Sequence, residues 1–180
     1  MIFEFEFLTE TYASGGLEGS LEERTRLDYP LGGREPLLPN WEIVCFNNVD
    51  PSLPTPDFFT VYRGGSVGLM PRVLNDLQLK SQFMAAGELL PVKLGEEDAY
   101  LFHPLVDLDA LDKKRSKFWK LSNGHVICKK AVFKSSFQTP HWFFRISGGK
   151  VLFTTSEFVE YYQKQGFTGI EFHPQQMSDA

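Results

Sequence analysis

The histidines are the residues of this chain that could most directly perform acid–base chemistry or bind a metal. His103, His125, His141 and His173 are separated by many positions, so they form no local ligand spacing of the kind that metal sites use. His103 and His173 share a setting, in "LFHP" and "EFHP", where the following proline favours an extended backbone at a strand end. We therefore expect these histidines to have structural roles. A hydrolase that uses His103 or His173 is the least favoured of the three functions considered for this chain. The stretch "GFTGIEFHP" (166–174) is expected to be a helix stop, a turn and a core strand.

The carboxylates, serines and cysteines form no recognised catalytic motif. "DLDALD" (107–112) lacks the central glycine and closing glutamate of a calcium-binding loop. "RGGSVG" (63–68) lacks the lysine and hydroxyl of a phosphate-binding loop, and the chain has no Gly-x-Ser-x-Gly elbow. Cys45 and Cys128 lie in expected apolar strands, where a thiol is normally inert. The sequence thus predicts no enzyme, no metal and no cofactor.

A basic segment at residues 113–130 offers a different chemistry, because lysines can neutralise phosphates and aromatic rings can stack on bases. Phe118 and Trp119 stand among its cations, which are Lys113, Lys114, Arg115, Lys117, Lys120, Lys129 and Lys130. The chain as a whole carries a net charge of −5, which argues against a dedicated nucleic-acid binder. A nucleic-acid- or ligand-binding module that uses this segment is the alternative function, and a solvated basic face is the simpler interpretation.

The elements that position these residues predict an α+β fold of mostly antiparallel strands with two main helices. Residues 2–7 alternate phenylalanine with glutamate as a half-buried strand does, and residues 143–155 read as a hairpin around two glycines. Residues 71–87 and 156–166 each read as a helix closed by glycine and followed by a short strand that reaches a proline. These two units are interpreted as diverged helix–strand repeats.

Length and composition predict one domain, residues 1–180, with an acidic, loop-rich N-terminal lobe at residues 1–60 and a core at residues 61–180. The net charge is −8 over residues 1–60 and +7 over residues 113–180, so either an acidic surface meets a basic partner or the two oppositely charged halves complement each other within one fold. The N-terminus lacks the basic start of a signal peptide, and no apolar run reaches the roughly 20 residues of a membrane span. Two cysteines are too few for a disulfide scaffold. We expect a cytoplasmic protein without a membrane partner.

Three segments carry a resemblance to a known family: "ELLPVKL", "YLFHPLVDLDALDKKRS" and "FFRISGGKVLFTTSEFVEYYQKQGFTGIEF". They resemble bacterial polymorphic-toxin immunity proteins of a group long catalogued as a domain of unknown function. The matching positions, all within residues 68–174, are 91–94, Tyr100, 106–107, 111–112, Ser116, 144–145, 156–158, Gly166, 168–169 and Phe172. His103 departs from the family pattern, which has a small polar residue there. The resemblance implies a protein that binds and neutralises a cognate secreted toxin in the producer cell, and it supplies no catalytic residues.

An acidic surface is our expectation for the contact with that toxin, because a toxin that acts on nucleic acid or nucleotides often has a basic cleft. A proline-stiffened loop around residues 50–59 and an acidic turn at residues 96–98 add to the N-terminal carboxylates. The predicted partner-binding residues are Glu18, Glu22, Glu23, Asp28, Asp50, Asp57, Phe58, Phe59, Glu96, Glu97 and Asp98. The sequence leaves open whether the protein forms a homodimer.

Overall fold

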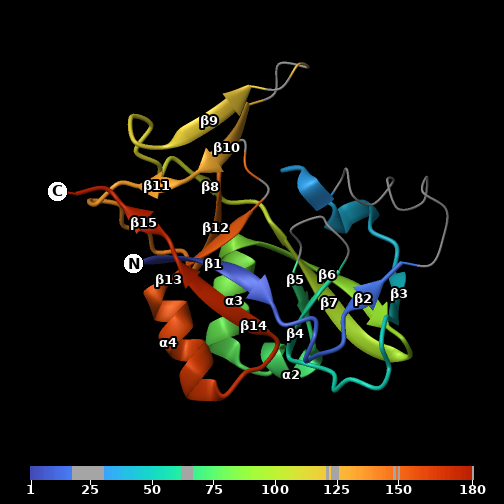
Figure 1. Ribbon diagram of the computed structural model, residues 1–180. Helices are drawn as coiled ribbons and strands as arrows, with labels where there is room; N and C mark the ends of the chain where they lie inside the picture. Colours follow the sequence, from blue (N-terminus) through green and yellow to red (C-terminus); the bar gives the residue numbers. More distant parts are fainter. Residues whose placement is uncertain are drawn as a thin grey trace.

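The computed structural model describes residues 1–17, 31–61, 67–120, 122, 126–147, 149 and 151–179, and in this part it has an α+β fold, as the sequence predicts (Figure 1). Most strand pairs are antiparallel, and the strands form two main sheets and two small ribbons. The helices lie beside the sheets, and the β9–β10 ribbon extends from the top of the view in Figure 1.

The larger sheet has six strands in the order β2-β3-β6-β7-β5-β4. Its centre is the long hairpin of β6 and β7, in which Leu94 pairs with Glu97 across a turn that contains Gly95 at φ 60°. β3 runs parallel to β6, and the other pairs in the sheet are antiparallel. The strands are β2 (Gly15–Gly16), β3 (Val44–Asn48), β4 (Phe58–Thr60), β5 (Val67–Leu69), β6 (Gly87–Leu94) and β7 (Glu97–Pro104).

The second sheet has five strands in the order β14-β1-β13-β12-β8, and the N-terminal strand lies inside it. The alternating strand and the glycine hairpin predicted from the sequence are both present, as β1 and as β12–β13. The strands are β1 (Ile2–Phe7), β8 (Asp107–Leu108), β12 (Phe143–Ile146), β13 (Leu152–Thr155) and β14 (Ile170–Pro174). The two ribbons are β9 (Lys117–Lys120) with β10 (Val126–Lys130), and β11 (Val132–Phe133) with β15 (Gln176–Met177).

The first expected helix is divided in two, whereas the second forms as one piece. The elements are α2 (Pro71–Leu74), α3 (Leu77–Ala86), α4 (Ser156–Gln165) and a short 3₁₀ turn, η1 (Leu38–Asn40). The division follows from Asp76, whose carboxylate accepts a hydrogen bond from the backbone N–H of Leu79 at 3.0 Å. Because an aspartate that binds this N–H is a strong N-cap, a new helix starts after Asp76.

Both helix–strand units exist, as α3–β6 and α4–β14, but their local geometry differs. Gly166 closes α4 in the left-handed conformation, with φ 65°, whereas Gly87 follows α3 with an extended φ of 173°. β6 lies between β3 and β7 in one sheet, and β14 is an edge of the other.

The central core joins the two sheets through aromatic side chains. Phe83 of α3 stacks on Phe143 of β12 with ring centroids 4.2 Å apart, and Phe102 of β7 meets both rings edge-on. Phe158 of α4 lies 4.6 Å from Phe143. Since two helices and both sheets share these contacts, the halves of the chain stabilise each other through burial of apolar surface.

The stretch "GFTGIEFHP" makes backbone hydrogen bonds to segments of both sheets. The backbone N–H of Leu8 donates to Gly169 O at 3.1 Å, and that of Phe58 donates to Thr168 O at 3.0 Å. Gly169 has φ 109°, and a Cβ placed there would lie 1.8 Å from Phe58 O. The stretch is a helix stop, a turn and a strand, as predicted, and its glycine allows two backbones to approach closely.

Candidate binding surfaces

Of the predicted acidic residues that the structure describes, Asp57 is buried and the others are exposed. Asp50 and the three carboxylates of the β6–β7 turn, Glu96, Glu97 and Asp98, are exposed. Glu18, Glu22, Glu23 and Asp28 lie outside the described residues.

The exposed group gathers at one end of the six-stranded sheet because β3 runs parallel to β6. Gly95 N donates to Phe46 O at 2.7 Å, which places the β6–β7 turn beside the end of β3, where Val49 and Asp50 follow. Val49 is an exposed apolar side chain. We call Val49, Asp50, Glu96, Glu97 and Asp98 the acidic end.

Two local interactions shape the charge of the acidic end. Asp50 accepts hydrogen bonds from the hydroxyl of Ser52 at 2.6 Å and from its backbone N–H at 3.0 Å, and these bonds lower the pKa of Asp50. Lys93 forms an ion pair with Asp98 at 2.6 Å. Within the part of the chain that the structure describes, Glu96 and Glu97 have no ion-pair partner, so they carry the uncompensated charge of this surface.

Asp57, Phe58 and Phe59 correct the prediction of a partner-binding loop. Phe58 and Phe59 are each 1 % exposed and belong to the cores on opposite faces of the six-stranded sheet. Asp57 is 5 % exposed, and its carboxylate binds the Arg72 guanidinium and accepts two hydrogen bonds from Thr168, both at 2.9 Å. These side chains stabilise the fold and cannot reach a partner, so they are excluded from the surface.

The described histidines have structural surroundings. His103 is buried, its Nε2 donates to the carbonyl oxygen of Glu35 at 3.1 Å, and burial lowers its pKa. His173 Nε2 lies 2.6 Å from a carboxylate oxygen of Glu6, in an exposed contact between β14 and β1. His141 is half-buried, and His125 lies outside the described residues.

The thiols differ from each other in exposure. Cys45 is exposed on β3 rather than enclosed, whereas Cys128 is half-buried and burial raises the pKa of its thiol. Over the described ranges, no cluster of three histidine, cysteine or acidic side chains could hold a metal ion.

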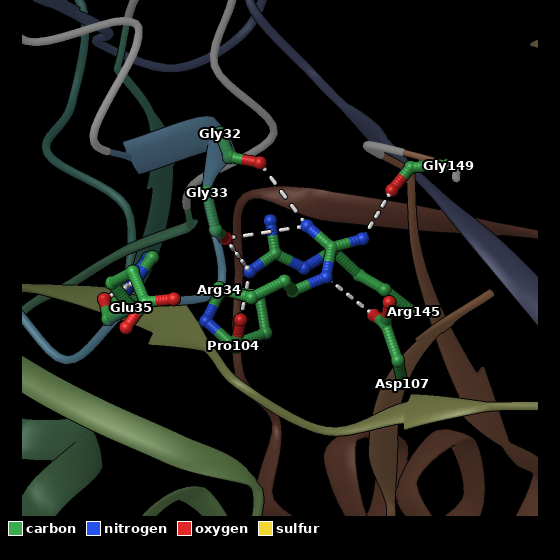
Figure 2. Close-up of polar contacts among 9 residues, drawn as sticks. Gly32, Gly33, Arg34, Glu35, Pro104, Asp107, Arg145 and Gly149 are labelled. Carbon is green, nitrogen blue, oxygen red and sulfur yellow. Dashed lines mark hydrogen bonds and ion pairs between the residues drawn. The ribbon is translucent and has the colours of Figure 1, made fainter. Parts of the chain in front are cut away.

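A cluster of charged side chains lies where residues 32–35 cross the ends of β7 and β12, and sequence reasoning missed it (Figure 2). Arg34 Nε donates to the Asp107 carboxylate at 2.6 Å, and its Nη2 donates to Gly149 O at 2.6 Å. Its Nη1 donates to the carbonyls of residues 32 and 33. One side chain thus binds four separate backbone or carboxylate positions.

Arg145 lies beside Arg34 and is 0 % exposed. Its Nη2 donates to Gly33 O at 2.9 Å and to Pro104 O, whereas its Nε and Nη1 have no partner in the described chain. Burial, followed by the positive charge of Arg34, lowers the pKa of Arg145 to about 10. The group remains a cation at neutral pH, and its hydrogen bonds go to backbone carbonyls. The cluster therefore anchors residues 32–35 to the sheets and holds no nucleophile or free base.

The basic segment forms the β9–β10 ribbon and its base. Trp119 is 57 % exposed, and Phe118, Val126 and Ile127 are exposed beside it. Lys117, Phe118, Trp119 and Lys129 line a shallow hollow of about 460 Å³. The sequence identified the residues of this surface, and the strand pairing decides which of them share a face.

Comparisons with known proteins add no identification. No protein-family model and no curated protein matches the chain. None of the helices in the described part of the chain is long and apolar enough to cross a membrane.

Proposed function

We propose that this chain is an immunity protein, which binds a cognate secreted toxin in the cytoplasm of the producing cell and blocks it without performing a reaction of its own. The acidic end carries the proposal, because two separate segments that charge and composition singled out lie together on one exposed surface. Val49 adds an exposed apolar side chain at this end of the sheet, and protein interfaces commonly combine apolar with charged groups.

The positions that carry the family resemblance are consistent with this proposal because they have scaffold roles. Ser116 Oγ bonds to both the N–H and the C=O of Val132, and Asp107 and Arg145 belong to the arginine cluster. Thr168 holds the buried Asp57. Polar residues that stabilise the backbone in this way are expected of a rigid inhibitor, in which loops and turns supply the contacts.

Blockade by the acidic end would be steric and electrostatic. Tight inhibitors bury about 1,600 Å² in total, and complementary charges raise the association rate. Unpaired Glu96 and Glu97 on a fixed turn suit a basic cleft, such as that of an enzyme acting on nucleic acid.

The test is a binding and growth assay with the toxin domain encoded beside the gene for this chain. An inactivated toxin domain should co-purify with the chain, and the chain should restore growth of cells that express the active domain. Glu96→Lys together with Glu97→Lys should slow association about tenfold at low salt. Glu160→Lys together with Glu171→Lys, at exposed positions of α4 and β14, is the charge-matched control. A wild-type chain that neither binds nor protects would overturn the proposal.

A nucleic-acid- or ligand-binding module is the second candidate, favoured by the exposed Trp119 and Phe118 among lysines. A gel-shift assay with single-stranded oligonucleotides tests it. Binding through phosphates must weaken steeply as salt rises, and no shift at low salt would exclude it.

A further inference from the structure

The β9–β10 ribbon has one face turned toward the body and one toward solvent. Trp119 pairs directly with Ile127, and Phe118 pairs with Cys128. Because side chains alternate along a strand, these pairs occupy opposite faces. Cys128 packs against the core of the five-stranded sheet, so the Trp119–Ile127 pair is on the outward face.

The outward face is apolar and cationic. Trp119 and Ile127 are 57 % and 39 % exposed, and Lys129 lies over the indole ring at 5.6 Å from its centroid. Lys117 is on the same face as Trp119, two residues before it. A two-stranded ribbon is marginally stable by itself, and an exposed apolar face of this kind marks an interaction site.

Two cations at the base of the ribbon, Lys113 and Arg115, are paired with carboxylates, whereas those on the ribbon are not. Lys113 pairs with Asp109 at 3.3 Å, and Arg115 pairs with Asp179 at 2.7 Å. In the part of the chain that the structure describes, the ribbon lysines have no carboxylate within ion-pair distance: Lys117, Lys120, Lys129 and Lys130. The positive charge is therefore free to meet a partner where the apolar side chains are exposed.

The base fixes the ribbon to the body. Ser116, just before β9, is buried, and its hydroxyl donates to Val132 O at 3.2 Å and accepts from Val132 N at 3.0 Å. Asp112 N also donates to Val132 O, at 2.8 Å. These bonds join the two strands where they leave the core, so the outward face has a set orientation and less conformational entropy is lost on binding.

We infer that the outward face of the β9–β10 ribbon, centred on Trp119 and Ile127, is a second contact with the toxin. The matching surface of the toxin would be apolar at its centre and acidic at its rim. This inference rests on the proposed function. Free lysines around an apolar pair complement such a face, and tryptophan is the residue type most enriched at binding hot spots. A protein partner is favoured over a nucleic acid because Ile127 cannot stack on bases as an aromatic ring does, and Lys129 covers the indole ring.

Binding of the inactivated toxin domain to ribbon variants, measured by calorimetry or surface plasmon resonance, tests this inference. Trp119→Ala should weaken binding about 30-fold, as truncation of a hot-spot tryptophan does. Lys117→Glu with Lys129→Glu should slow association about tenfold and reduce its salt dependence. Leu77→Ala and Lys164→Gln change an exposed apolar and an exposed cationic residue elsewhere, and should leave binding unchanged.

The outcomes separate the inference from the proposed function. Toxin binding that is slowed in the Glu96/Glu97 variant but unchanged by Trp119→Ala overturns the inference alone. A wild-type chain that does not bind the toxin domain overturns both. Self-association that Trp119→Ala abolishes would reassign the face to a second copy of the chain. A salt-sensitive gel shift of a single-stranded oligonucleotide of about 20 bases, long enough for at least one binding site, would reassign the face to nucleic acid if Lys117→Glu with Lys129→Glu abolishes it. Unchanged circular dichroism of each variant shows that a loss of binding is local.

Discussion

Replacement of Asp57 by alanine should destabilise the protein and leave toxin binding intact, although this residue lies in a loop whose composition suggests a partner surface. The substitution removes the acceptor of two hydrogen bonds from Thr168, at 2.9 Å each, and the ion pair with Arg72. Because the Arg72 side chain is 62 % exposed, its pair with Asp57 contributes only about 0.5–1 kcal/mol.

The loss at Thr168 is the larger part of the effect. A buried backbone N–H left without an acceptor costs about 1–3 kcal/mol, so the sum for Asp57→Ala is about 3 kcal/mol. In a chain of 180 residues, this should lower the melting temperature by about 6–12 °C. Arg72→Ala should cost about 1 kcal/mol or less, and Asp50→Ala, at an exposed position in the same acidic segment, should stay within about 0.5 kcal/mol.

Urea unfolding and calorimetry of these variants, with a titration of each against the inactivated toxin domain, check the prediction. Thr168→Val should be destabilising, and the double variant with Asp57→Ala should show a coupling energy because both changes break one network. A melting temperature for Asp57→Ala within about 2 °C of wild type, together with lost toxin binding, would refute the structural assignment of Asp57.

Two further predictions concern the backbone and the buried histidine. Gly169→Ala should cost about 3 kcal/mol or more in unfolding free energy, because the added Cβ would lie 1.8 Å from Phe58 O. Gly95→Ala, at φ 60° with open space around it, should cost about 1 kcal/mol. Urea unfolding measures both costs, and equal values would contradict the close approach at Gly169. The pKa of His103 is lowered in the folded protein from its ordinary 6.5, so the unfolded chain takes up the proton first and stability is lost as the pH falls below about 6.5. His103→Gln should therefore reduce the pH dependence of unfolding between about pH 7 and pH 5, and an unchanged slope would show that the imidazole is not the group responsible.

Local patterns in the sequence were sufficient where neighbours along the chain determine the structure. The alternation of Phe3, Phe5 and Phe7 predicts β1, and the glycines near residue 148 predict the β12–β13 hairpin. The break between α2 and α3 was also encoded locally, by the capping aspartate Asp76, but the apolar spacing across it suggested one continuous helix.

Contacts between distant segments could not be predicted in this way. Asp57 looks like a surface charge until Thr168, which is 111 residues further along the chain, binds it. The acidic end depends on the parallel pairing of β3 with β6, and no local pattern predicts that pairing. The basic segment was identified from composition, but only the register of Trp119 with Ile127 shows which side chains share the outward face.

Perturbed ionisation would be a misleading guide to function in this protein. Arg145 has one of the most strongly shifted pKa values, and among the described residues its guanidinium donates to the backbone carbonyls of Gly33 and Pro104. A strongly shifted group is a candidate for a functional site only when it also faces a cleft, and Arg145 has no exposed surface. For the proposed binding function, the informative residues are instead exposed, as Glu97 and Trp119 are. If the proposed contacts are right, substitutions at those positions will change toxin affinity with little effect on stability, and Arg145→Met will change stability with little effect on affinity.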